Sequence, residues 1–128
     1  MSWKIFQAKN APSARSSHQL SSFGSCIYLY GGEDGPRDSH FGYGNPVLPG
    51  GAVHFLNLRE KEPAWKTIAI SPESSSPGPS PRLGHGQAID AAGALYVFGG
   101  RQPEQPGALD RIASLNDMHK LDLVWMSL

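Results

Sequence analysis

Short apolar runs, each followed by glycines, are the main feature of the hydrophobic pattern of this chain. Two such runs, 27–30 and 95–98, contain Ile, Leu, Val and aromatic residues and stop at a glycine pair. Runs of this length that end at glycine are typical of buried β-strands. The segment 52–58 has the composition of a third strand, and the alternation over 65–70 favours a fourth. Since no long segment keeps a helical period, the pattern predicts an all-β protein.

The chain contains an internal repeat. Arg15-Ser-Ser-His18 followed by Cys26-Ile-Tyr-Leu-Tyr-Gly-Gly32 recurs as Arg82-Leu-Gly-His85 followed by Ala94-Leu-Tyr-Val-Phe-Gly-Gly100. The offset is 67 residues between the arginines and 68 between the glycine pairs. A third feature, Val53-His-Phe-Leu-Asn-Leu58, recurs after 65 residues as Met118-His-Lys-Leu-Asp-Leu123. Three features in the same order at nearly one offset indicate two copies of one structural unit.

Long connections divide these copies. Residues 71–81 run Ser-Pro-Glu-Ser-Ser-Ser-Pro-Gly-Pro-Ser-Pro, which is typical of an extended linker that a protease can reach. We therefore expect a first unit over 1–70, a Pro/Ser linker over 71–81 and a second unit over 82–128. The double glycine permits a positive φ, so each apolar strand is expected to leave its sheet there.

Composition and charge exclude several classes of protein. Eleven Lys and Arg balance eleven Asp and Glu, which argues against a nucleic-acid clamp or a polybasic membrane binder. Cys26 is the one cysteine, so a disulfide framework and a CxxC metal site are excluded. The polar N-terminal run and the lack of a long apolar segment predict a cytoplasmic or nuclear protein without a membrane span.

The order Arg-x-x-His, apolar strand, Gly-Gly, spacer, aromatic-Asx-Leu and Trp resembles the kelch repeat. The resemblance covers residues 3 to about 123. It implies that each copy is one four-stranded blade of a β-propeller. The predicted fold is therefore a kelch propeller segment of about two blades. The second blade is expected to be incomplete, because Trp125 follows Leu123 by two residues whereas Trp65 follows Leu58 by seven.

A closer resemblance is to the opening blades of nitrile-specifier, epithiospecifier and thiocyanate-forming proteins of plants and their fungal kelch relatives. Trp3-Lys4, Tyr30-Gly-Gly-Glu33 and Tyr96-Val-Phe-Gly-Gly-Arg101 carry it. It implies a protein that steers the breakdown of a glucosinolate aglucone with Fe(II), held by a Glu, an Asp and a His spaced four residues apart. This chain departs from that motif, because Arg37 and Phe41 stand four and eight residues after Glu33.

Two blades are too few to close a propeller, which needs about 4–8. Three explanations follow. The chain is an N-terminal piece of a longer protein, which we favour; or copies assemble, for example as a trimer; or the chain folds alone as a small twisted β-sandwich. Open blade edges also predict self-association.

Arginines are the candidate ligand-binding residues. Arg101 directly follows the second glycine pair, and the family resemblance implies that this position faces an anionic group, which a planar guanidinium is suited to hold. Arg15 and Arg82 each precede a histidine by three residues, in the segment between blades that lines one propeller face. The alternative for Arg15 and Arg82 is a hydrogen bond between blades that recurs with the repeat, and for Arg101 a solvated loop position.

One polar cluster combines carboxylates with an imidazole. Glu33, Asp38 and His40 form it, with Asp34 and His54 within reach, and such donors suit a divalent ion. The alternative is a flexible acidic loop, so we predict no metal site. No hydrolase, zinc-protease or nucleotide motif is present, so no catalytic residue is predicted and enzymatic activity is left open.

The sequence thus predicts a kelch-type module that binds a protein partner or a small anionic ligand. The alternative is a nitrile-specifier-like protein, and a cofactor, Fe(II), is expected only under that alternative. No nucleic acid and no membrane are expected as partners. These functional expectations come from the repeat and the resemblance, since fold class alone does not give function.

Overall fold

The computed structural model describes residues 1–34, 45–47, 52–68, 78–103 and 111–123. The nine named elements among these residues are all β-strands. They form a four-stranded sheet, a three-stranded sheet and a two-stranded pair. In the described part of the chain, no helix is long and apolar enough to cross a membrane. The prediction of an all-β protein is confirmed.

The first sheet comes entirely from the first repeat. Its strands, in spatial order, are β1 (Gln19–Phe23), β2 (Cys26–Tyr30), β5 (Val53–Asn57) and β6 (Lys66–Ile68), and each pairs antiparallel with its neighbour. Gly24, at φ 60°, stands in the two-residue turn between β1 and β2. The connection from β2 to β5 contains a short separate pair, β3 (Glu33–Asp34) with β4 (Asn45–Pro46).

The second sheet comes from the second repeat and has three strands among the described residues. They are β7 (Gly86–Ile89), β8 (Ala94–Pro103) and β9 (Ile112–Asp122), antiparallel and in sequence order. The predicted strand 95–98 is therefore part of a longer one. The expectation that this strand leaves its sheet at the glycine pair is wrong, because β8 continues through Gly99 and Gly100 to Pro103. At a register shift between Phe98 and Gly100, Gly99 stands across from two residues of β9, Asn116 and Asp117, as in a β-bulge.

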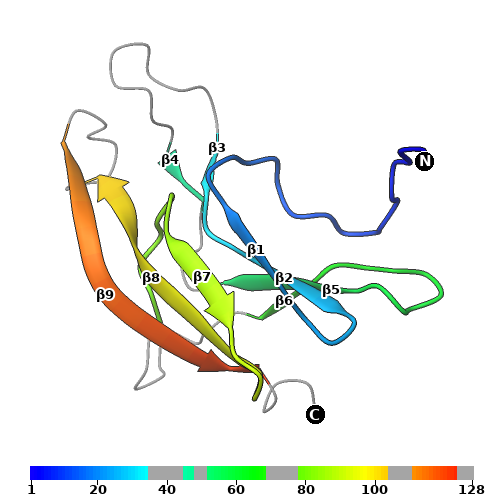
Figure 1. The fold of residues 1–128 in the computed structure, drawn as a ribbon. Coiled ribbons are helices and arrows are strands. Elements are labelled where there is room, and N and C mark those ends of the chain that lie inside the picture. Colours follow the sequence, from blue (N-terminus) through cyan, green and yellow to red (C-terminus); the bar gives the residue numbers. More distant parts are fainter. Residues whose placement is uncertain (35–44, 48–51, 69–77, 104–110, 124–128) are drawn as a thin grey trace.

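The main core lies between the two sheets, which face each other as adjacent blades would (Figure 1). Side chains from β2 and β5 meet side chains from β8 and the residue after β9; the buried members are Tyr28, Tyr30, Val53, Leu95, Val97 and Leu123. The two-residue period of a β-strand explains why alternate residues, such as Tyr28 and Tyr30, are buried, since every second side chain of a strand points to the same face. Gln87 links the sheets as well, because its Nε2 donates to Ser21 Oγ at 3.2 Å and to Tyr28 O at 3.3 Å.

Glycine is required where the glycine pair of each repeat passes close to the segment that precedes the first strand of the same repeat. Gly32 has a φ of 108°, and a Cβ there would lie 2.8 Å from Ser16 O. The equivalent Gly100 has a φ of 95°, and its Cβ would lie 2.8 Å from Leu83 O. Both glycines therefore need a left-handed backbone and the space that a missing side chain leaves.

The first unit and the linker can be compared with their predicted bounds. The strands β1 to β6 lie within 1–70, and β7 to β9 lie within 82–128. Of the predicted linker, residues 71–77 lie outside the described residues. Of the remaining four residues, Pro79 and Ser80 contact the first sheet, because Tyr30 Oη donates to Pro79 O at 3.4 Å and to Ser80 O at 3.2 Å.

Candidate functional site

Arg82 is buried and its side chain is held entirely by the chain itself. The side chain is 1% exposed. Nε donates to Ser80 O at 3.2 Å, and Nη1 donates to Gly99 O at 2.9 Å. Nη1 and Nη2 also donate to the two carboxylate oxygens of Asp117 at 2.8 and 2.9 Å, and Nη2 donates to Ser80 Oγ at 3.2 Å. All five N–H groups of the guanidinium are used, which favours a structural role over ligand binding. The side chain supports its own sheet, however, and does not make the hydrogen bond between blades that the sequence left as the alternative.

Arg15 repeats this arrangement in the first sheet, with one difference. Its Nε and Nη2 donate to Ser13 O and Ser13 Oγ at 3.1 and 3.2 Å, and Nη1 donates to Gly31 O at 3.1 Å. These acceptors are the equivalents of Ser80 and Gly99 in the other repeat. At the position of Asp117 the first repeat has Ala52, so a carboxylate is missing. Partial burial lowers the pKa of Arg15, and the nearby charge of Asp34 acts in the opposite direction.

Arg101 and Glu33 occupy equivalent positions directly after the two glycine pairs. The backbone of Arg101 pairs with that of Leu83, with N···O distances of 2.9 and 3.0 Å in the two directions. Glu33 pairs in the same way with Ser16, at 2.8 and 3.0 Å. The Arg101 guanidinium packs over Gly84, where a Cβ would lie 3.0 Å from Nη2. Arg101 is half-buried, and it stands at the end of the sheets where both glycine pairs lie.

The predicted polar cluster is only partly described. Asp38 and His40 lie outside the described residues. Glu33 is 2% exposed, in β3, and Ser16 Oγ donates to its Oε1 at 3.2 Å. Its buried position differs from the flexible acidic loop that the sequence left as the alternative. Within the described ranges, no three His, Cys, Asp or Glu side chains lie close enough to hold one metal ion.

The two histidines of the repeat, His18 and His85, stand directly before β1 and β7. His85 is 2% exposed, and its ring meets the Tyr30 ring edge-on at 5.2 Å between centroids. Its Nε2 lies 3.3 Å from Gln87 Oε1. Burial lowers the pKa of His85; the hydrogen bond with Gln87 opposes this shift, and the nearby charge of Arg82 adds to it. The ring is thus held in its neutral form near neutral pH.

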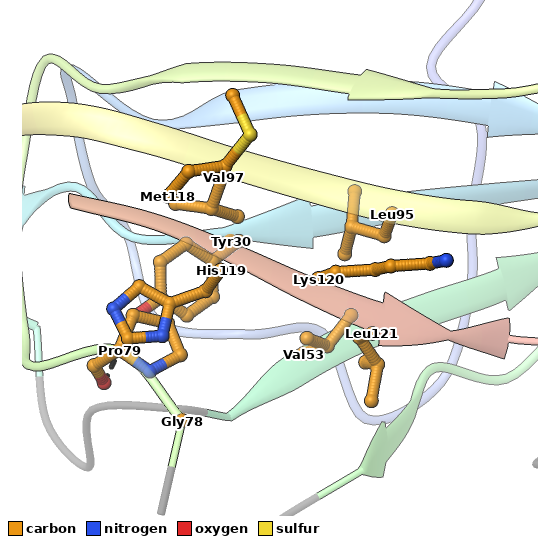
Figure 2. Close-up of a pocket in the computed structure, with 10 residues that line it drawn as sticks. All are labelled: Tyr30, Val53, Gly78, Pro79, Leu95, Val97, Met118, His119, Lys120 and Leu121. Carbon is orange, nitrogen blue, oxygen red and sulfur yellow. Dashed lines mark hydrogen bonds between the residues drawn. The ribbon is translucent and has the colours of Figure 1, made fainter.

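A cavity of about 270 Å³ opens between the two sheets beside β9 (Figure 2). Apolar side chains form most of its wall, with Tyr30, His119 and Lys120 as the polar members; the lining residues are Tyr30, Val53, Gly78, Pro79, Leu95, Val97, Met118, His119, Lys120 and Leu121. Its volume lies just under the usual range of about 300–1,000 Å³ for small-molecule pockets. Among the described residues that line it, none is a serine, threonine or cysteine nucleophile.

His119 connects this cavity to the buried arginine. Its Nε2 lies 2.7 Å from Asp117 Oδ2, so Asp117 bridges the imidazole and the Arg82 guanidinium. Hydrogen bonds from Arg82, and then from His119, hold the pKa of Asp117 far below its ordinary value. Sequence reasoning missed Asp117 and His119 as site residues. The one available signal was the repeat itself, because Asp117 directly precedes its third feature.

Comparisons with known proteins place the chain among longer relatives. No protein-family model matches it. It is 27% identical over 115 residues to serine/threonine-protein phosphatase BSL2 of Arabidopsis thaliana, across 87% of this chain and 10% of that protein. It is 30% identical over 99 residues to Adagio protein 3 of the same plant, across 77% of this chain and 15% of that protein.

Tip elongation aberrant protein 3 of Schizosaccharomyces pombe is 32% identical over 113 residues, across 88% of this chain and 8% of that protein. The chain therefore spans 8 to 15% of the length of these three relatives. Among solved structures, that of YjhT is similar in fold, with a TM-score of 0.56 and 23% identity. The similarity covers 93% of this chain and 27% of that one.

Proposed function

We propose that this chain, which belongs to the kelch-repeat proteins as its three relatives and YjhT do, is a protein-interaction module. Kelch repeats generally mediate contacts between proteins. The proposal rests on one observation: equivalent segments of both repeats lie together at the end of the two sheets where the glycine pairs are. At this end, residues 13–18 and 80–85, which we call the lead-in segments, meet the two glycine pairs.

Backbone hydrogen bonds between the repeats make this end a fixed surface. Gly32 N donates to Arg82 O at 3.0 Å, and Gly84 N donates to Ser17 O at 2.9 Å. The side chains of the partly buried Arg15 and the buried Arg82 hold each lead-in segment to the first residue of its glycine pair, through Gly31 O and Gly99 O. A surface fixed in this way lowers the ordering cost of binding a partner.

The polar groups at this end give the surface its chemical character. Asp34 is exposed and Arg101 is half-buried, so the first repeat presents an acidic group and the second a basic one. Neighbouring charges of opposite sign favour a partner with the complementary arrangement, and such pairs mainly give specificity and speed of association. We therefore assign Arg101 to partner binding, whereas Arg15 and Arg82 support the surface from beneath.

The test is affinity capture with the full chain, quantified by mass spectrometry, for the wild type and two charge-reversal variants. Arg101→Glu changes the proposed surface. Arg59→Glu is the matched control, because Arg59 is exposed beyond Asn57, at the opposite end of the first sheet. Proteins that the wild type and Arg59→Glu retain, and that Arg101→Glu loses, support the proposal. Equal capture by both folded variants refutes the assignment of this surface.

Binding of a small anionic ligand is the second candidate, favoured by the position of Arg101 directly after Gly99 and Gly100. Arg101→Ala is expected to weaken binding of inorganic sulfate or a sulfated ligand without unfolding the chain. Unchanged affinity in calorimetric titration removes Arg101 from the site. Under the nitrile-specifier alternative, Fe(II) binds as well; titration of the reduced, anaerobic chain with Fe(II) tests this, and lack of binding leaves this chain without that chemistry.

A further inference from the structure

A small cavity lies beside the guanidinium of Arg15 in the first repeat. Four residues of its wall have equivalents in the second repeat, and they are Arg15, Gly31, Ala52 and His54. The equivalents are, in the same order, Arg82, Gly99, Asp117 and His119. Hydrogen bonds join these four equivalents, with the carboxylate of Asp117 at the centre. The cavity of the first repeat thus corresponds to the place that a carboxylate fills in the second.

Arg15 keeps two N–H groups without an acceptor among the described residues. In the second repeat, Nη1 and Nη2 of Arg82 each donate one N–H to a carboxylate oxygen and another N–H elsewhere. In the first repeat, Nη1 of Arg15 donates to Gly31 O and Nη2 to Ser13 Oγ, and no described residue accepts the other N–H of either nitrogen. Among the described carboxylates, Asp34 acts on Arg15 through its charge but forms no ion pair with it. Within the described part of the chain, the guanidinium therefore has two donors left for an external acceptor.

His54 adds a second donor to the wall of this cavity. Thr67 Oγ1 lies 2.8 Å from its Nδ1, and a hydroxyl that donates to Nδ1 leaves the ring proton on Nε2. In the second repeat it is likewise Nε2 of His119 that lies 2.7 Å from Asp117 Oδ2. Burial, and then the nearby charge of Arg15, lower the pKa of His54. The two side chains are thus close enough to repel each other when both are charged, and an anion between them stabilises both.

The size and the walls of the cavity limit what it can hold. Its volume is about 10 Å³, close to the roughly 10–15 Å³ that one water-sized atom needs. One carboxylate oxygen is of that size, whereas a whole tetrahedral sulfate or phosphate is not. Val47, Ala52 and Pro81 add apolar walls, and Ala52 is buried. Such surroundings strengthen a hydrogen bond between a charged donor and a charged acceptor.

We propose that this cavity binds the carboxylate group of an external ligand between Arg15 and His54. One carboxylate oxygen enters the cavity and the other stays at its mouth, and together they accept from both side chains, as those of Asp117 do in the second repeat. The carboxylate belongs to a small organic acid or to an acidic side chain of a partner protein, and the chemistry of recognition is the same. The proposal does not depend on partner binding at Arg101.

The first experiment compares thermal unfolding in sodium formate and in sodium chloride at equal ionic strength. With formate at about ten times its Kd, the ratio of folded to unfolded wild type rises about eleven-fold, which raises Tm by roughly 5 °C. Ala52→Asp attaches a carboxylate at the site and is expected to have one Tm in both salts. The matched control is Ala91→Asp, which adds the same charge in the exposed turn between β7 and β8 and keeps the response to formate. A wild type with equal Tm in both salts, or a folded Ala52→Asp chain that still responds to formate, overturns the proposal.

The second experiment follows the pKa of His54 by nuclear magnetic resonance and identifies the source of the carboxylate. The ring signal of His54 is assigned by its loss in His54→Gln. The wild type is titrated with acetate, with a blocked peptide that contains one glutamate, and with the same peptide containing glutamine instead. A bound carboxylate raises the pKa of His54, because it places a negative charge beside the ring.

The ligand that produces this rise decides between the two sources. A rise with acetate that the glutamate peptide does not exceed assigns the site to a small organic acid. A larger rise with the glutamate peptide at the same concentration assigns it to an acidic side chain of a partner protein. No rise with either ligand, or an equal rise with the glutamine peptide, overturns the proposal.

Discussion

Asp117→Asn removes the charge that faces the buried guanidinium of Arg82. In the wild type, both carboxylate oxygens accept from Arg82, at 2.8 and 2.9 Å, and one also lies 2.7 Å from His119 Nε2. The amide keeps one oxygen acceptor but turns an NH₂ group toward a donor. Arg82, 1% exposed, then keeps its bonds to Gly99 and Ser80 and one uncharged bond to the amide oxygen, and it loses the opposite charge and the second bond. We expect a marked loss of stability.

The size of this loss follows from burial of the two partners. Breaking a fully buried ion pair costs about 3–5 kcal/mol, and a hydrogen bond to a charged group contributes roughly 1.5–3 kcal/mol. The Asp117 side chain is 44% exposed, so water reaches it and screens the interaction. The lower range therefore applies, and we expect a loss of about 2 kcal/mol in the free energy of unfolding. For a chain of this length, that lowers Tm by roughly 6–10 °C.

Urea unfolding followed by tryptophan fluorescence measures this loss at pH 7. Glu62→Gln is the matched control, because the Glu62 side chain is 79% exposed and its pair with Lys9 is long, at 3.8 Å. A change of under about 0.5 kcal/mol is expected there. A loss for Asp117→Asn no larger than for Glu62→Gln refutes the structural role of the Arg82–Asp117 pair.

The pH dependence of the free energy of unfolding independently tests whether the charged carboxylate of Asp117 stabilises the fold. The pKa of Asp117 is lower in the folded chain than in the unfolded one, so its contribution is complete above the unfolded pKa of about 3.9. The contribution is lost as the pH falls further, toward the folded pKa. The stability gap between wild type and Asp117→Asn is thus expected to be constant from pH 7 to 5 and to shrink below about pH 4. A gap that does not change on acidification contradicts this reasoning.

Three further predictions concern the repeat. Ala52→Asp supplies the missing carboxylate beside Arg15 and is expected to raise the free energy of unfolding by about 1 kcal/mol in urea titrations; a loss contradicts the equivalence of the two arginines. Gly100→Ala is expected to cost about 2–3 kcal/mol, from its φ of 95° and the contact with Leu83 O, against under 1 kcal/mol for Gly86→Ala, whose Cβ would have 3.8 Å of space. Since burial lowers the pKa of His85, protonation favours unfolding, and stability is expected to fall as the pH drops below about 6.5. A His85→Asn variant with an unchanged pH slope between 7.5 and 5.5 argues against this.

The candidate site could be predicted only in part from sequence. The repeat located both lead-in arginines and both histidines, because one backbone geometry needs the same residue types twice, whereas Arg101 came from the family resemblance and has Glu33 as its equivalent. It did not reveal that Arg82 has a carboxylate partner and Arg15 has none. That difference depends on which side chain β9 and β5 place beside each guanidinium, and Asp117 and Ala52 are 35 and 37 residues from their arginines.

The local pattern alone predicted the two equivalent units and some of their strands, but not β1 or β7. Strands β2, β5, β6 and the start of β8 follow from short apolar runs, because a β-strand is defined by side chains at a period of two. Only the tertiary structure decided that β8 continues through Gly99 and Gly100. The reason is that pairing with β9, which lies further along the chain, outweighs the local tendency of glycine to end a strand.

The uncovered parts of the molecule are likewise a matter of tertiary structure. Tyr30 and Phe98 have nearly the same side chain and the same sequence context, yet one is 2% and the other 48% exposed. The sequence predicts that both Tyr30 and Phe98 are stabilised by burial against another sheet. The fold decides which one has it, because burial depends on what lies across the face and not on the strand itself.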